Sequence, residues 1–343
     1  MNVNASSFES NPIFRSDYET PSAGGASIPS LSMKDDLARQ KSAMLSRCSE
    51  AARRCGRTLL FGMTTSLILQ SVPVPSECGI NADDLHVTSS SKDRRIRVNH
   101  SDLRAHAWKP LPSASNVRIG SRVYALELAH TWAQLAPYLT LESLIVLGDS
   151  ILHAITSQPA LARGRDASEI RRDFVETVTG LPPFKGKPRC MRVMTILEER
   201  AASPKESESR LILLRHGIPM PRTGYAVPDA RFASGAAMTL DLAWPQYRIG
   251  VEYDGDQHRT DKMQWRRDQE KREWLRNRGW VVITLTGANL ADEVSKAEYA
   301  FNVARHLTLA GARFVFSVVP MPLEKAIGRC RESKEAESVM AGG

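Results

Sequence analysis

The stretch TLDLAWPQYRIGVEYDGDQH, from Thr239 to His258, decides the predicted fold of the second half of the chain. Apolar and polar residues alternate on both sides of Pro-Gln-Tyr-Arg, and this period of two is typical of half-buried strands joined by a tight turn. The apolar positions are Leu240, Leu242 and Trp244 on the first arm and Ile249, Val251 and Tyr253 on the second. A turn centred on Gln246 and Tyr247 sets the register. It pairs Trp244 with Ile249, Ala243 with Gly250, and Asp241 with Glu252.

Three carboxylates gather on one face of this predicted hairpin. Directly paired residues share a face, and Asp254 lies two residues beyond Glu252, so both converge with Asp241. Ala243 and Gly250 are small and leave open space beside them. Two carboxylates about 5 Å apart repel by about 3 kcal/mol at an effective dielectric constant of about 20, so a proton or a cation must relieve the repulsion. An all-oxygen set favours Mg²⁺ or Mn²⁺, whereas a hairpin whose acids face water is the plain alternative.

Upstream of the hairpin, the sequence predicts a helix with two differently placed acids. Ser203 is the expected N-cap, and Glu206 completes a capping box with it, which gives Glu206 a local structural role. Glu208 precedes Leu211 and Ile212 by three and four positions and so shares their face. We therefore expect Glu208 to point toward the packed side, where a buried acid needs a partner.

Downstream, residues 261–278 read as a helix and Trp280 to Leu285 as a buried strand, so strand, helix and strand predict a right-handed parallel crossover. Eight basic and four acidic residues lie between Arg259 and Arg278. Most of them suit an ordinary solvated helix, but the basic excess also suits binding of a phosphate backbone. The expected phosphate contacts are Arg259, Arg266, Arg267 and Lys271. A helix near residues 292–309 and an apolar strand from Phe314 to Val319 complete this part.

The composition limits the class of protein. The chain has 343 residues and a net charge of +8, which allows two cores and a polyanionic partner such as DNA. Its five cysteines are odd in number and none shows C-x2-C spacing, so neither a disulfide framework nor a structural zinc site is predicted. The sequence has no signal-peptide pattern and no apolar run that could cross a bilayer. We therefore expect a cytoplasmic protein without a membrane partner.

The chain is predicted to be α/β and to divide into five segments. Residues 1–33 form a disordered tail, because they are rich in Ser, Asn, Pro and Gly. Residues 34–157 form a smaller α+β domain, and residues 158–202 form a proline-containing helical connector. A second domain with a mixed sheet flanked by helices covers residues 203–320, and a polar tail covers residues 321–343.

A family resemblance joins these features. The run LDLAWPQYRIGVEYDGDQHRTDKMQWRRDQEKREWLRNRGWVVITLT, Leu240 to Thr286, resembles bacterial endonuclease-like domains related to very-short-patch-repair endonucleases, of the restriction-endonuclease-like superfamily. SESRLILL, from Ser207 to Leu214, is similar to the acidic helix of that family. The first half, Thr58 to Ile155, is similar to the middle region of actinobacterial antitoxin or regulator-type proteins, without their winged helix.

The resemblance implies a restriction-endonuclease-like fold and a Mg²⁺-dependent or Mn²⁺-dependent DNA endonuclease or nickase. It implies that Asp241 is the central metal ligand with Glu252 and Asp254 as companions. It further implies that Glu208 is a ligand or orients one, and that His258 moves a proton or contacts a phosphate. The superfamily signature usually has a lysine two residues after Glu252, and here Asp254 stands in that position.

Two other functions remain open at this point. The nuclease fold could serve only as the scaffold of a non-catalytic DNA-binding regulator or antitoxin-like protein, or the substrate could be RNA. Asp241, Glu252, Asp254 and Glu208 together favour catalysis, since a pure scaffold has no use for this set. The sequence carries no signal for an oligomeric state.

Overall fold

The computed structural model describes residues 32–93, 102–255 and 262–341, without the side chains of 262–265 and 333–341. The chain divides into two compact units, Met1–Ser30 and Leu31–Gly343, and the first lies outside the described residues. Nearly all of the predicted tail, residues 1–33, is therefore outside the description, as are His258 and Arg259. No helix in the described ranges is both long and apolar enough to cross a membrane.

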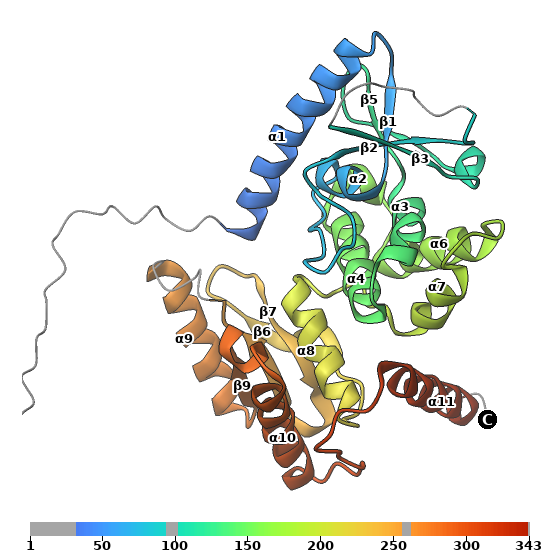
Figure 1. Ribbon diagram of the computed structural model, residues 1–343. Coiled ribbons are helices and arrows are strands. Elements are labelled where there is room, and N and C mark those ends of the chain that lie inside the picture. Colours follow the sequence, from blue (N-terminus) through green and yellow to red (C-terminus); the bar gives the residue numbers. More distant parts are fainter. Residues whose placement is uncertain (1–31, 94–101, 256–261, 342–343) are drawn as a thin grey trace, which may run out of the picture. The chain divides into compact units, whose positions relative to one another are not determined.

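The second unit contains two mixed sheets flanked by helices, which confirms the predicted α/β class. The first sheet has the strand order β3-β2-β1-β5-β4 (Figure 1). Its strands are β1 (Leu59–Phe61), β2 (Leu85–Ser89), β3 (Leu103–Ala107), β4 (Val117–Arg118) and β5 (Val123–Ala125). Two helices, α1 (Met33–Arg54) and α2 (Met63–Leu69), share a core with this sheet.

A layer of helices follows the first sheet in the sequence. Its members are α3 (Leu128–Leu135), α4 (Leu141–Ser157), α5 (Pro159–Ala162), α6 (Ala167–Gly180) and α7 (Lys187–Val193). Local capping explains where two of them begin. The Thr140 side chain accepts from the amide of Ser143 at the start of α4, and Asp166 and Glu169 form a capping box at the start of α6.

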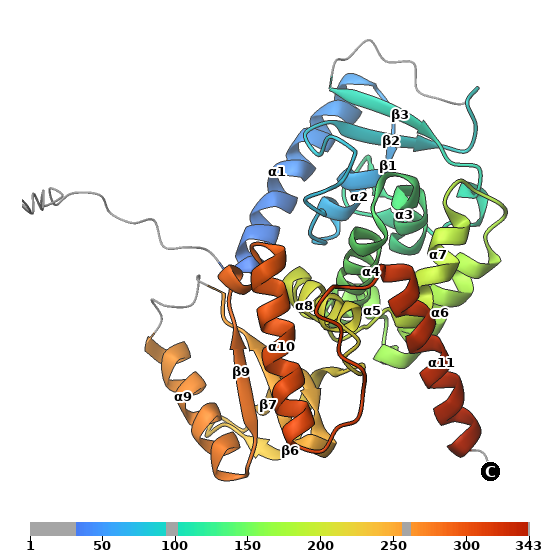
Figure 2. The same cartoon turned by 60° about the horizontal axis from the view of Figure 1, so that its bottom comes forward.

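The second sheet contains the two strands of the predicted hairpin. Its strands are β6 (Arg222–Arg231), β7 (Ala237–Trp244), β8 (Ile249–Tyr253) and β9 (Val281–Leu285), in that spatial order. The predicted parallel pairing of β8 with β9 is confirmed. One face is covered by α9 (Lys262–Asn277) and the other by α8 (Pro204–Arg215) and α10 (Glu293–Leu309), as Figures 1 and 2 both show.

The hairpin register is as predicted for its first two pairs. Trp244 pairs with Ile249 and Ala243 with Gly250, and the turn is a short 3-10 helix, Pro245–Tyr247. The described pairing of β7 and β8 ends at Leu242 and Val251. The third predicted pair, Asp241 with Glu252, is therefore not a ladder pair.

The predicted alternation fails at Leu240. Leu242 and Trp244 enter the core on the α8 and α10 side, but Leu240 packs with Ala243 and Leu275 on the α9 side. A Cβ added to Gly250 would lie 2.7 Å from Leu240 Cδ1. The open space expected beside Gly250 is therefore filled by a leucine side chain.

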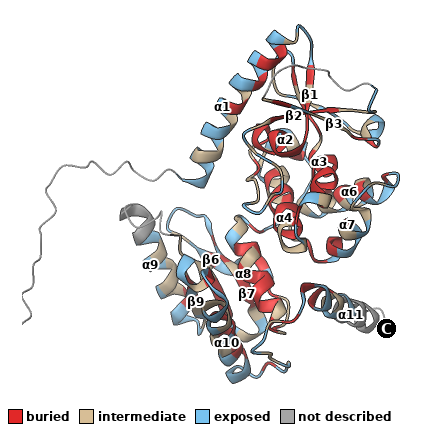
Figure 3. Ribbon diagram, viewed as in Figure 1, coloured by how far each residue is buried: buried red, intermediate tan, exposed pale blue. Residues whose placement is uncertain are grey.

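Helix α8 has hardly any solvent face. All residues from Glu206 to Leu214 are buried except Glu208, and Figure 3 shows the helix mostly in the buried colour. Leu211 and Leu214 belong to the helical core with α4, whereas Ile212 and Leu213 belong to the core of the second sheet. The helix predicted to open the second domain therefore belongs to two cores.

Two expectations for the C-terminal part are wrong. Residues 314–319 form no strand in the described structure; the amides of Ser317 and Met321 donate to carbonyls at the end of α8 instead. Residues 321–343 are not a polar tail, because α11 (Leu323–Ala341) forms there. Leu323 and Ile327 of α11 are buried in the helical core, so its apolar spacing of four outweighs its polar composition.

Candidate functional site

Asp241 lies where β7 and β8 separate. Its Oδ2 atom accepts a hydrogen bond of 2.7 Å from the amide of Tyr253. Since the described ladder ends one pair earlier, the carboxylate supplies a hydrogen-bond acceptor to an amide at the end of β8. This bond holds Asp241 at the opening between the two strands.

Glu206 lies in the first turn of α8, close enough to Asp241 for the charge of Asp241 to act on it. Only 7% of Glu206 is exposed, and its carboxylate accepts from the amide of Ala202 and from the Ser203 hydroxyl, both at 2.9 Å. Burial first, and the charge of Asp241 second, raise the pKa of Glu206 to about 7. Burial also raises the pKa of Asp241, against the opposing effects of the Tyr253 amide and the Lys271 charge. The charge of Asp241 thus makes Glu206 harder to ionise.

Glu252 meets Lys271 on the α9 side of the sheet. The two side chains form an ion pair and are only 19% and 14% exposed. Lys271 precedes the fully buried Leu275 by four positions, so α9 presents both residues on its packed face. Burial raises the pKa of Glu252, while the charge and hydrogen bond of Lys271 act in the opposite direction.

We call Glu206, Asp241, Glu252 and Lys271 the carboxylate cluster. It combines three acids from two strands and α8 with one ammonium group from α9. Three acids against one cation leave a surplus of negative charge, and oxygen donors of this kind suit Mg²⁺ or Mn²⁺. Within the described ranges, no three acidic, histidine or cysteine side chains already form a cation-holding group. A divalent cation bound here would share Glu252 with Lys271.

The structure places the other predicted acids differently. The prediction that Glu208 faces the packed side is corrected: its side chain is 28% exposed and pairs with Lys205 at 2.7 Å. It lines a cleft of about 520 Å³ together with Glu142. Asp254 lies just after β8, where its amide donates to the Leu285 carbonyl at 2.7 Å. No side-chain contact between Asp254 and the cluster occurs among the described residues.

The predicted phosphate contacts also separate into two groups. Arg266 and Arg267 are exposed on α9, and neither pairs with a described carboxylate. Lys271 differs from the expectation, since it faces the cluster rather than solvent. Farther along α9, Arg278 lies over the Trp274 ring with its guanidinium carbon 3.6 Å from the ring centroid.

Sequence reasoning missed Glu206 and the position of Lys271. The sequence nevertheless contains a pattern that indicates the burial of each of these two residues. Four consecutive apolar residues, Leu211 to Leu214, point to every side of α8, which indicates a helix buried all round, so its cap acid could not be fully solvated. The spacing of four from Lys271 to Leu275 likewise places the lysine on the buried stripe of its helix.

Comparison with known proteins gives two relatives and no function. Over 118 residues the chain is 28% identical to the "Uncharacterized protein MT2308" and the "Uncharacterized protein Rv2248", both from Mycobacterium tuberculosis. The match covers 34% of this chain and 42% of each relative, so the chain spans less than half the length of the curated relatives it matches. No protein-family model matches the chain. No solved structure matches it.

Proposed function

We propose that the protein is a metal-dependent DNA endonuclease or nickase with a restriction-endonuclease-like second half. The observation that carries the proposal is the carboxylate cluster itself, in which Glu206, Asp241 and Glu252 lie together with raised pKa values. Buried acids in this number are costly without a function, and functional sites are where such perturbed groups gather. The family resemblance of residues 240–286 supports the same reaction.

The position of each residue suits a different role in the proposed reaction. Asp241 and Glu252 would hold Mg²⁺ or Mn²⁺, which supplies a more acidic bound water and charge stabilisation at the scissile phosphate. Glu206, a buried acid close to Asp241, would be the group placed to take a proton from water. Ala202 and Ser203 hold its carboxylate in place.

Lys271 supplies the positive charge that the hairpin lacks. Asp254 stands where the usual signature has a lysine, but the ammonium of Lys271 reaches Glu252 from α9. From there it can orient Glu252 and contact an anionic phosphate oxygen. A lysine at this place is compatible with activity despite the acid at position 254.

The exposed arginines of α9 provide a surface for DNA. Arg267 lies four positions before Lys271, which is about one helical turn, or about 6 Å along the axis. Arg266 is its exposed neighbour. Phosphates bound by these two side chains would pass one turn from the cluster, as hydrolysis of a backbone bond requires.

Cleavage of supercoiled plasmid tests the proposal. Purified protein is incubated with Mg²⁺, with Mn²⁺ and with a chelator, beside the variants Asp241→Asn and Glu252→Gln. The matched control is Glu293→Gln, an acid of α10 whose side chain is 65% exposed. We expect metal-dependent nicking by the wild type and the control, and none by the two cluster variants.

The rival function makes a different prediction in the same assay. A DNA-binding regulator built on this fold would bind plasmid in all four forms and nick it in none. Activity on single-stranded RNA with none on DNA would instead establish the third possibility. Equal nicking by all four proteins would indicate a contaminating nuclease and reject the cluster as the site.

A further inference from the structure

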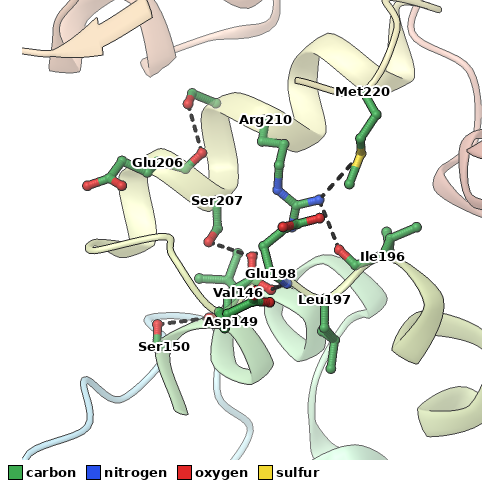
Figure 4. Close-up of polar contacts among 12 residues, drawn as sticks. Val146, Asp149, Ser150, Ile196, Leu197, Glu198, Glu206, Ser207, Arg210 and Met220 are labelled. Carbon is green, nitrogen blue, oxygen red and sulfur yellow. Dashed lines mark hydrogen bonds and ion pairs between the residues drawn. The ribbon is translucent and has the colours of Figure 1, made fainter. Parts of the chain in front are cut away.

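A second charged group lies on the other side of α8. Asp149 of α4 and Arg210 of α8 form an ion pair of 2.7 Å, and both side chains are fully buried. The same Asp149 Oδ2 atom accepts from the Ser207 hydroxyl at 2.7 Å, while Oδ1 accepts from the amide of Glu198 at 2.8 Å. Figure 4 shows these contacts converging on Asp149.

These contacts also hold the segment that enters α8. Arg210 donates from Nη1 to the Ile196 carbonyl at 3.0 Å, and Asp149 holds the amide of Glu198. At the other end of this segment, the amide of Ala202 donates to the Glu206 carboxylate. Residues 196–203 are therefore fixed at one end by the buried pair and at the other end by Glu206.

Stability alone does not explain this arrangement. Removing two charges from water costs about as much as their attraction returns, so apolar residues of similar volume often do as well. Arg210 Nε also lacks a hydrogen-bond partner among the described residues, which adds to the cost. An ion pair with several directed hydrogen bonds defines the position and the rotation of the helix. An apolar contact does not define them in this way.

We propose that Asp149 is a positioning residue, which through Ser207 and Arg210 fixes the rotation of α8 and so keeps Glu206 against Asp241. The inference rests on the proposed function where it concerns catalysis, but its geometric part does not. It means that α4, from the first half of the chain, completes the carboxylate cluster of the second half.

The helix geometry explains why rotation matters. Ser207 follows Glu206 directly, and successive residues are about 100° apart around a helix. Figure 4 shows Glu206 pointing away from the side on which Ser207 reaches Asp149. If the bonds to Asp149 are lost, rotation or fraying of the first turn of α8 carries the Glu206 carboxylate away from Asp241.

Hydrogen exchange of the full-length protein tests the geometric part. In Ser207→Ala, which keeps the ion pair, amide exchange in peptides covering residues 203–212 should rise about threefold to fivefold. In Asp149→Asn it should rise about tenfold or more. Phe174→Leu is the control, because Phe174 is buried in α6 and packs on Trp132 rather than on α8. It should speed exchange only in proportion to its overall loss of stability.

Kinetics test the catalytic part. Asp149→Asn should lower kcat for plasmid nicking about tenfold at saturating Mg²⁺, with the Kd for DNA unchanged, because only the placement of Glu206 is affected. Phe174→Leu should keep the wild-type kcat at a temperature where it is folded. A kcat that stays at the wild-type value in Asp149→Asn would overturn the proposed role in catalysis.

The exchange result decides the positioning inference whether or not the wild type is a nuclease. Exchange in residues 203–212 that rises no more in Asp149→Asn and Ser207→Ala than in Phe174→Leu would overturn it. A wild type without any nicking activity, combined with selective loss of protection in α8, would reject the proposed nuclease and leave the positioning of Glu206 supported.

Discussion

Two inward-facing ion pairs among the described residues differ in how completely their acids are paired. Asp149 and Arg210 are both fully buried, and three donors surround the Asp149 carboxylate. Glu252 and Lys271 are 19% and 14% exposed, and Asp241 and Glu206 add two more acids nearby. The charges of the first pair balance each other, whereas the second pair together with its two neighbouring acids has a surplus of negative charge.

This difference indicates different uses. A buried carboxylate that already accepts three hydrogen bonds cannot exchange a partner without a large loss of stability, which suits a structural link between α4 and α8. A cluster with surplus acid can accept a proton or a cation at little cost, which suits binding and catalysis. Arg210 of the first pair and Glu206 of the carboxylate cluster both lie within the first two turns of α8, so one helix joins a fixed link to a reactive group.

The largest expected effect comes from breaking the satisfied pair. Arg210→Met leaves the buried Asp149 carboxylate without its counter-charge and should lower the free energy of unfolding by about 3 to 5 kcal/mol. The double variant Asp149→Leu, Arg210→Met should recover most of this loss, because no charge is then left buried. Urea denaturation measures both. A loss below about 1 kcal/mol in the single variant, or no recovery in the double variant, would contradict the role assigned to this pair.

The next effect concerns the unsatisfied cluster. Asp241→Asn should reduce nicking about 100-fold to 1000-fold, about 3 to 4 kcal/mol in transition-state free energy, because a charged metal ligand is lost. The apo variant should melt above the wild type, since a repulsion with Glu206 is removed, and it should gain little from millimolar Mg²⁺. Thermal melting with and without metal checks this. A wild type whose melting temperature ignores both Mg²⁺ and Mn²⁺ would leave only the scaffold function.

The pH dependence of the free energy of unfolding provides a third test, which concerns Glu206 of the carboxylate cluster. The pKa of Glu206 is about 7 in the folded protein against an ordinary value of 4.5. Between these values the folded state keeps a proton that the unfolded state has lost, so this contribution is full below pH 4.5 and declines as pH rises to about 7. Its size is up to about 3 kcal/mol.

Urea denaturation between pH 4.5 and 8 measures this contribution. Glu206→Gln should remove it, whereas Glu293→Gln, which alters an exposed acid of α10, should retain it. An identical pH profile for the wild type and Glu206→Gln would show that Glu206 titrates as an ordinary acid and is not coupled to Asp241.

Local sequence patterns predicted much of the fold. The period-two alternation around Pro245 located β7 and β8, and the turn set two correct pairs. The parallel pairing of β8 and β9 followed from the helix between them. These features depend on residues close in sequence. The prediction for Leu240 is wrong, because the side of the sheet on which this residue lies does not follow from local alternation. It depends on the local separation of β7 from β8 and on the space beneath α9.

The candidate site was predictable only in part for the same reason. Asp241 and Glu252 lie on one hairpin, so turn geometry brought them together. Glu206 and Lys271 come from two helices on opposite faces of the sheet, and no local pattern specifies which turn of each helix meets the strands. The choice of Glu208 over Glu206 used apolar neighbours to define a buried side, but α8 is buried on nearly every side and that criterion cannot distinguish the two acids.

The smallest expected effect tests whether the outer surface of α9 binds DNA independently of the cluster. Replacing Arg266 and Arg267 with glutamine removes two phosphate contacts, so the slope of log K against log salt should fall by about 1 to 2 units. Lys325 and Arg329 of α11, both exposed, provide a control with the same change of charge. Fluorescence anisotropy with a DNA duplex in chelator measures binding without cleavage. An unchanged slope in the α9 variant would reject this face as the binding surface. An equal change in the α11 control would show that net charge rather than this face governs binding. In either case the arginines would have no specific connection with the carboxylate cluster one turn away.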